Sequence, residues 1–165
     1  MPGDERPRPR PGPPTAPPRL WTVEEANGRL AALRELLPRL RAWATRLGEV
    51  HAELDRLQRF WGDELQARDH PDHGLCTRLE AEWRNLARRL DEAVSALRAE
   101  GIELKQLEHG LVDFYALLDG DLVLLCWRTD EPEVGFYHTL ESGFAGRRPL
   151  PARRRSVPTE SRGPF

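Results

Sequence analysis

The sequence predicts an α+β fold in which a long antiparallel helical hairpin packs with a small antiparallel sheet. Up to residue 100, apolar residues recur at helical spacing, whereas 102–141 contains short alternating or apolar segments separated by turn residues. Both ends, 1–19 and 151–165, are rich in proline and arginine and nearly devoid of apolar residues. We therefore expect one domain over 20–150, flanked by two disordered tails.

The composition excludes a membrane protein and indicates a cytoplasmic one. Charged residues make up 32% of the chain, and no run approaches the roughly 20 apolar residues that a membrane-spanning helix needs. The first residues lack the apolar segment of a secretory signal. The two cysteines, Cys76 and Cys126, lie far apart and form no CxxC motif, which indicates free thiols in a reducing compartment.

The net charge of −2 is unevenly distributed along the chain. Residues 20–146 contain 24 acidic and 15 basic side chains, whereas both tails carry an excess of arginine. An acidic body disfavours nucleic-acid binding, because affinity for phosphates depends on basic contacts. Binding of nucleic acid through the arginine-rich tails is the weakest of the functional hypotheses.

The first ordered element is a helix that begins at Thr22. Thr22 and Glu25 have the spacing of a capping box, in which each side chain accepts a hydrogen bond from the other residue's backbone amide. A heptad pattern of apolar residues follows with alternating spacings of three and four: Leu33, Leu36, Leu40, Trp43, Leu47, Val50, Leu54, Leu57 and Trp61. Pro38 interrupts this pattern, so we expect a short helix, a break or kink near Leu37, and a long helix to about Trp61.

A second amphipathic helix is predicted after a loop over 62–74. Its apolar positions are Leu75, Leu79, Trp83, Leu86, Leu90, Ala93 or Val94, and Leu97, and it stops at Gly101, a favourable residue for ending a helix. The two helices would form an antiparallel, coiled-coil-like hairpin from Thr22 to about Glu100. Apolar seams that lack a partner associate, so we expect a homo-oligomer, most simply a homodimer.

The segment after Gly101 has the pattern of three or four short strands. Residues 102–107 alternate between apolar and polar, residues 110–120 end in an Asp-Gly turn, and 121–128 and 134–140 are apolar and aromatic runs around the loop TDEPE. These features predict a small antiparallel sheet over 102–141.

The last two predicted strands contain a candidate metal site. If the connecting turn is centred on Pro132, Cys126 lies directly opposite His138, whereas a one-residue slip separates them. Thiolate and imidazole are zinc ligands, and Glu141, Asp113 or His109 could complete the set. The residues therefore suggest a zinc site at Cys126, His138 and Glu141, with Asp113 as an additional candidate.

Other interpretations of the same residues remain open. Cys126 and His138 could form a thiolate–imidazole pair for nucleophilic catalysis, or a buried cysteine and a hydrogen-bonded histidine within a packed sheet. Two nearby cations, Arg147 and Lys105, could contact an anion or a carboxylate, and Arg147 could instead pair with a nearby glutamate. The sequence does not decide whether the protein is an enzyme.

Two segments carry a resemblance to a known family. WTVEEAN (21–27) and GIELKQLEHGLVDFYALLDGDLVLLCWRTDEPEVGFYHTLESGFAGRRPL (101–150) resemble the prokaryotic "domain of unknown function" family number 2203. The family commonly has Trp where Tyr137 stands and Gly where Asp130 stands. The resemblance implies a helical hairpin with a small β part in a bacterial cytoplasm, and no activity. The residues that match the family's recurring pattern are Lys105, Asp113, Cys126, Trp127, Glu133, His138, Glu141, Gly143 and Arg147.

Besides nucleic-acid binding, two functional hypotheses follow from these observations. The first is a non-enzymatic binding or scaffolding module that self-associates through its helical hairpin. The second is a metal-binding or hydrolytic protein with a Cys/His/Glu site in the C-terminal β-hairpin.

Overall fold

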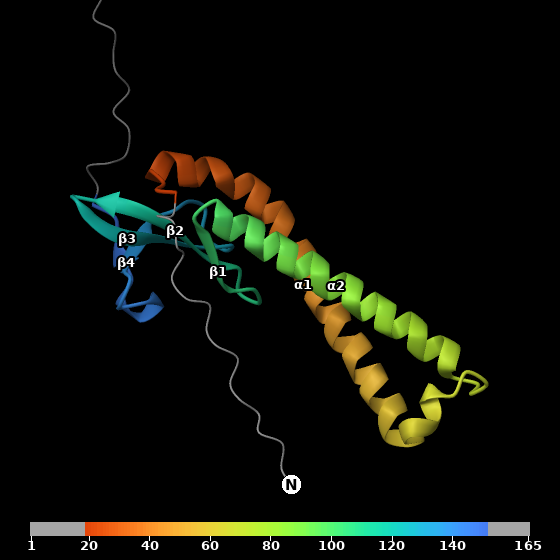
Figure 1. Cartoon of the computed structure of the whole chain (residues 1–165). Helices are drawn as coiled ribbons and strands as arrows, with labels where there is room; N and C mark the ends of the chain where they lie inside the picture. Colours follow the sequence, from red (N-terminus) through yellow and green to blue (C-terminus); the bar gives the residue numbers. More distant parts are fainter. Residues whose placement is uncertain (1–18, 152–165) are drawn as a thin grey trace, which may run out of the picture.

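The computed structural model describes residues 19–151, and Figure 1 shows a helical hairpin joined to a sheet. The prediction of disordered tails over 1–19 and 151–165 lies outside the described residues, apart from Arg19 and Pro151. The helical elements are α1 (Val23–Trp61), the 3₁₀ turn η1 (Gly62–Gln66), α2 (His73–Ala99) and the short 3₁₀ turn η2 (Phe144–Gly146). The strands are β1 (Ile102–Gln106), β2 (Leu111–Leu118), β3 (Asp121–Arg128), β4 (Phe136–Thr139) and β5 (Arg148–Pro149).

Helix α1 begins with the predicted capping box. The amide of Glu25 donates to Thr22 Oγ1 at 3.1 Å, and the amide of Thr22 donates to Glu25 Oε2 at 2.9 Å. The preceding Trp21 is buried, packs edge to face on Phe114, and donates its indole N–H to the carbonyl oxygen of Glu100 at 2.7 Å. The start of α1 is therefore fixed to both the sheet and the end of α2.

Of the break or kink predicted near Leu37, the break is wrong, because α1 continues through Pro38 as one helix of 39 residues. Leu37 and Leu40, on either side of the proline, are fully buried in the core. Packing of these two side chains outweighs the hydrogen bond that proline removes. The helix bends along its length (Figure 1), as helices with an internal proline commonly do.

The sheet is an antiparallel meander with strand order β1-β2-β3-β4-β5. It has five strands rather than the predicted three or four, because Arg148 and Pro149 return beside Tyr137 and Phe136. A bulge between Leu104 and Gln106 shifts the register of β1. The tight turn between β2 and β3 is formed by the predicted Asp-Gly pair, with positive φ at both residues.

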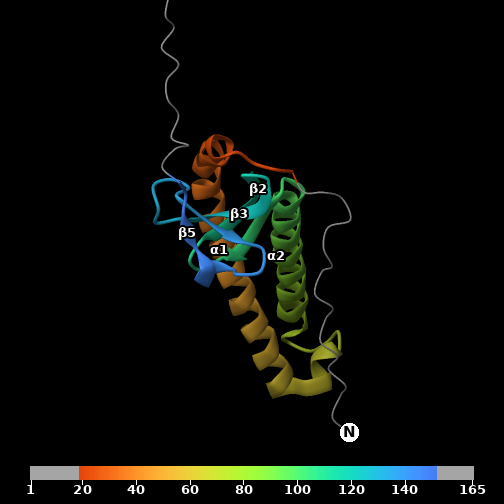
Figure 2. The ribbon, with the colours of Figure 1, turned by 90° about the vertical axis from the view of Figure 1, so that its left-hand side faces the viewer.

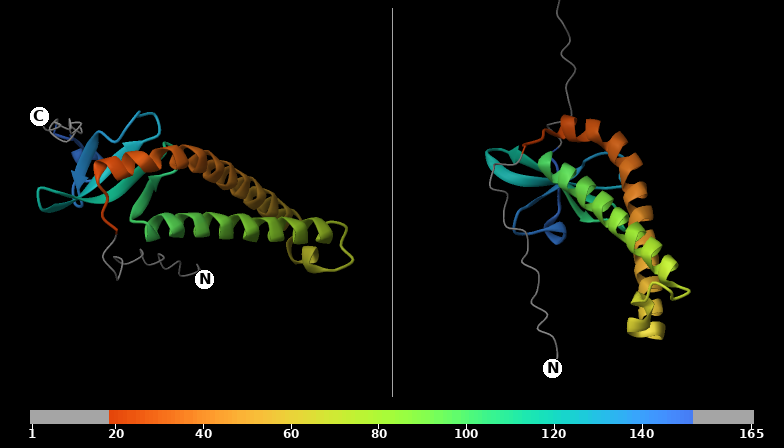
Figure 3. Two further views of the ribbon diagram at one scale, coloured as in Figure 1. Left: turned by 90° about the horizontal axis from the view of Figure 1, so that it is seen from above. Right: turned by 45° about the vertical axis from the view of Figure 1, so that its right-hand side comes forward.

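The hydrophobic core has two parts, one under the sheet and one within the hairpin. In the first part, one face of β2 and β3 packs on the first half of α1 and the end of α2. The second part is smaller and consists of Val50, Leu79 and Leu86 with partly buried neighbours on both helices. Figures 2 and 3 show the consequence, with the sheet at one end of the hairpin and the η1 connection at the other.

The two helical seams pack against each other within one chain. The smaller core is surrounded by partly buried leucines of both helices: Leu47, Leu54 and Leu57 of α1, and Leu75 of α2.

Neither α1 nor α2 contains an apolar stretch that could cross a bilayer.

Candidate functional site

The loop between β3 and β4 sets the register on which the candidate site depends. Cys126 pairs with Phe136, and His138 pairs with Leu124. Neither of the two registers considered from the sequence is therefore correct, the direct opposition of Cys126 and His138 or the one-residue slip. The pairing is centred on Glu131 instead of Pro132, because the Glu131 carboxylate accepts from the amide of Arg128 and the Glu131 amide donates to the Arg128 carbonyl oxygen, both at 2.9 Å. This two-residue shift leaves Cys126 and His138 on the same face of the sheet, as diagonal neighbours.

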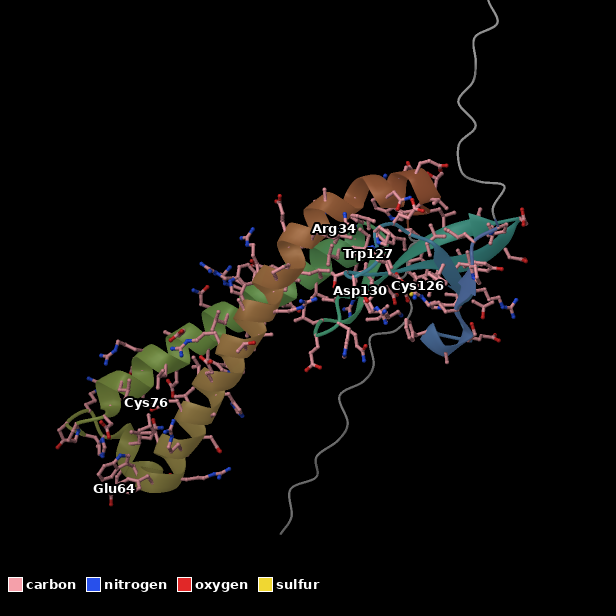
Figure 4. The ribbon with its side chains drawn as sticks, turned by 180° about the vertical axis from the view of Figure 1, so that it is seen from behind. Arg34, Glu64, Cys76, Cys126, Trp127 and Asp130 are labelled. Atoms are coloured by element: carbon pink, nitrogen blue, oxygen red, sulfur yellow. The ribbon has the colours of Figure 1, made fainter. Side chains whose placement is uncertain are left out.

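Asp113 completes a cluster with these two side chains. It lies directly opposite Cys126 on the neighbouring strand β2. One ligand atom from each of Asp113, Cys126 and His138 lies within 4.8 Å of the other two. The residues are 1%, 0% and 3% exposed, although they lie on the face of the sheet opposite the helix-packed core of Val112, Phe114 and Leu125. We call these three residues the Asp/Cys/His cluster; Figure 4 labels Cys126 in the sheet.

The hydrogen bonds of His138 define where its protons lie. Nδ1 is 2.8 Å from the carbonyl oxygen of Thr139, which can only accept, so Nδ1 carries a proton. Nε2 is 3.0 Å from Asp113 Oδ2, and one proton must lie between these two atoms. Burial raises the pKa of Asp113, against the opposing effects of His138, Cys126 and Lys105. The other carboxylate oxygen, Oδ1, has no hydrogen-bond partner among the described residues.

The Cys126 thiol is protonated at neutral pH. Burial raises its pKa to about 12, and the negative charge of Asp113 contributes in the same direction. A nucleophilic cysteine needs a lowered pKa, so this environment gives the thiol little reactivity. A metal ion would reverse the effect, since a coordinating thiol loses its proton to the metal.

The two residues predicted to contact an anion, Arg147 and Lys105, each form an ion pair with a carboxylate of the protein. Arg147 donates to Glu131 Oε2 at 2.5 Å and to the carbonyl oxygen of Cys126 at 3.3 Å. The Arg147 guanidinium also lies 4.2 Å from the ring centroid of Phe136. Lys105 pairs with Glu103, and its Nζ is 4.0 Å from Asp113 Oδ2.

Tyr115 is a neighbour of the cluster that the sequence did not single out. Its hydroxyl donates to Glu103 at 2.5 Å, and burial together with this bond raises its pKa to about 12. Burial alone would raise the pKa of Glu103, but the hydrogen bonds from Lys105 and Tyr115 lower it. The alternation of side chains along a strand could have indicated Tyr115, because it lies two residues after Asp113 on β2 and therefore on the same face of the sheet.

Glu141 lies apart from the Asp/Cys/His cluster. It is exposed in the turn after β4 and lines a separate surface hollow of about 440 Å³ with Leu140 and Arg148. The cluster consequently draws on β2, β3 and β4, and the turn that follows β4 contributes no ligand atom to it.

Comparison with known proteins identifies a family and no characterised relative. A family model described as "Uncharacterized conserved protein (DUF2203)" matches residues 19–150. No curated protein matches the chain, and no solved structure matches it.

Proposed function

Because the chain belongs to the DUF2203 family, whose description names no activity, we propose a function from the geometry of the site: the protein binds one transition-metal ion, zinc by preference, at Asp113, Cys126 and His138. The observation that supports this proposal most directly is the convergence of a carboxylate oxygen, a thiol sulfur and an imidazole nitrogen within 4.8 Å. Zinc bonds of roughly 2.0–2.3 Å in a tetrahedron place ligand atoms about 3.5 Å apart. The three side chains therefore need to move only slightly closer together to coordinate zinc.

The donor set and the charges around it suit a divalent transition metal. Carboxylate and thiolate would together neutralise a doubly charged ion, and a thiol ligand favours zinc over the magnesium and calcium that prefer oxygen. The adjacent cations Arg147 and Lys105 are already balanced by Glu131 and Glu103. A metal could therefore enter without leaving an uncompensated charge in the sheet.

Metal binding would also engage Asp113 Oδ1, which accepts no hydrogen bond from a nitrogen or oxygen atom of the described residues. Leaving a buried oxygen without such a bond normally costs about 1–3 kcal/mol. Three protein ligands leave one coordination position for water or another ligand. Since all three side chains are almost fully buried, we propose metal binding rather than hydrolysis of a substrate.

Metal analysis of protein purified without a histidine tag tests this proposal. We expect about one equivalent of zinc per chain, and a thiolate charge-transfer band after replacement by cobalt. Cys126→Ser and His138→Gln should each abolish stoichiometric binding. Cys76→Ser is the matched control, because Cys76 is also buried but lies on α2, near the far end of the hairpin (Figure 4). Less than about a tenth of an equivalent after zinc loading would reject the proposal.

Self-association of the hairpin as a scaffolding or binding module is a second candidate function. Two large side chains on the helices favour it, because Phe60 is 76% exposed and Trp83 is 38% exposed. Such residues are common in interfaces between subunits. Light scattering should then give about twice the chain mass of 18.9 kDa, and Trp83→Ser should shift the protein towards the monomer. A mass of one chain across micromolar concentrations would reject a homodimer.

A further inference from the structure

A second candidate site lies between the helices, away from the sheet. Trp43 of α1 is partly buried at the junction of the two hydrophobic cores. Beside it is a hollow of about 480 Å³, within the usual size range for small-ligand sites, lined by Arg39, Trp43, Arg89, Glu92 and Ala93. We call this hollow the Trp43 pocket.

Two arginines from different helices approach the same indole ring. The guanidinium carbon of Arg39 lies 5.5 Å from the Trp43 ring centroid, and that of Arg89 lies 5.6 Å from it. Cation–π contact with the ring orients both groups and leaves their N–H edges available for other partners.

Neither arginine has a counter-ion among the described residues, unlike two other arginines on the same helices. Arg46 forms hydrogen bonds to Glu82 at 2.7 and 3.0 Å, and Arg88 pairs with Glu92 at 2.9 Å. Over the described residues, no carboxylate within ion-pair distance is found for Arg39 or Arg89. In a body with an excess of acidic residues, the Trp43 pocket therefore gathers two uncompensated positive charges.

From this arrangement we propose that the Trp43 pocket binds a small organic oxyanion, a carboxylate or a phosphate ester, between Arg39 and Arg89. Planar guanidinium groups bind both kinds of anion through paired N–H···O contacts. The volume of the Trp43 pocket is large enough for a small molecule. Glu92 lines the pocket as well, and its negative charge opposes such a ligand. The ion pair between Glu92 and Arg88 partly compensates that charge.

Titration of the full-length protein with citrate and with pyrophosphate tests the proposal and distinguishes the two anion classes. The readout is the indole N–H signal of Trp43 in a heteronuclear NMR spectrum, assigned among the five tryptophans with Trp43→Phe. We expect saturable binding of at least one probe. Arg39→Gln and Arg89→Gln should each weaken it by roughly tenfold or more, the effect of losing a charged hydrogen bond.

Two further variants distinguish binding in the Trp43 pocket from non-specific attraction of an anion to positive surface charge. Arg84→Gln removes the same charge from an exposed position of α2 outside the pocket and should leave the affinity unchanged. Glu92→Gln removes a negative charge from the lining and should tighten binding. The proposal is overturned if neither probe saturates the Trp43 signal, or if Arg84→Gln weakens binding as much as Arg89→Gln does.

Discussion

At the residue scale, the alternation of side chains between the two faces of the sheet determines which of them can form a site. Asp113 and Cys126 are directly paired, and His138 reaches them from the next strand because an even shift in register preserves its face. The sequence could predict that Cys126 and His138 belong to neighbouring strands. It could not predict the register, because the position of the turn depends on hydrogen bonds of Glu131 that have no short-range sequence signal.

The raised pKa of Cys126 gives a direct prediction about its reactivity. In Cys76→Ser protein, which retains only Cys126, a thiol reagent at pH 8 should react at least about a hundredfold more slowly than with a free thiol, because so little thiolate is present. Unfolding in denaturant should restore the full rate. A native rate equal to that of a free thiol would instead support a nucleophilic cysteine.

Tyr115 predicts how stability depends on alkaline pH. Its pKa is about 12 in the folded protein and about 10 in an unfolded chain, so the folded state retains the proton over this interval. The stability that Tyr115 contributes is fully present below pH of about 10 and is lost as the pH rises towards 12. Urea unfolding at several pH values should show a shallower decline in Tyr115→Phe than in the wild type. Parallel pH profiles for the two proteins would contradict this assignment.

At the element scale, the connection between α2 and β1 depends on a glycine. Gly101 has a φ of +73°, and a Cβ atom there would lie 2.4 Å from the carbonyl oxygen of Arg19. The chain before Trp21 therefore passes close to the end of α2. The sequence predicted Gly101 as the end of the helix, but not its contact with a residue 82 positions earlier.

Substitutions of two glycines should therefore have opposite effects. Gly101→Ala should lower the free energy of unfolding by more than about 1 kcal/mol, because alanine is strained at positive φ and would clash with backbone. Gly48→Ala should raise it by roughly 0.5–1 kcal/mol, since Gly48 lies inside α1 with open space around it. Denaturant unfolding measures both changes. Equal effects of the two substitutions would show that the backbone at Gly101 is not constrained as described.

The continuity of α1 shows where local sequence rules stop applying. Pro38 is a reliable signal of a helix break in an isolated segment. Here both ends of α1 are anchored, the N-terminal half by the sheet and the C-terminal half by α2. Tertiary contacts that are distant in sequence keep the helix intact across the proline, and such contacts cannot be read from a local pattern.

At the scale of the whole molecule, the proposed metal would link three neighbouring strands of the sheet through their side chains. β2, β3 and β4 each contribute one residue of the Asp/Cys/His cluster. The ligands exist in this arrangement only in the folded sheet, so metal binding and folding must be thermodynamically coupled. The α+β class and the hairpin were predictable from periodicity, whereas this convergence required the register of two strand pairs.

Coupling of this kind predicts that zinc raises the thermal stability of the whole domain. A ligand that binds only the folded state stabilises it by about 2.7 kcal/mol at a free concentration one hundred times its Kd. The unfolding temperature should therefore rise with free zinc concentration in the wild type and in Cys76→Ser, and should remain constant in His138→Gln. Differential scanning calorimetry in zinc-buffered solutions measures this dependence. If the wild type and His138→Gln respond equally, zinc acts elsewhere on the protein, and the Asp/Cys/His cluster serves only to pack the sheet.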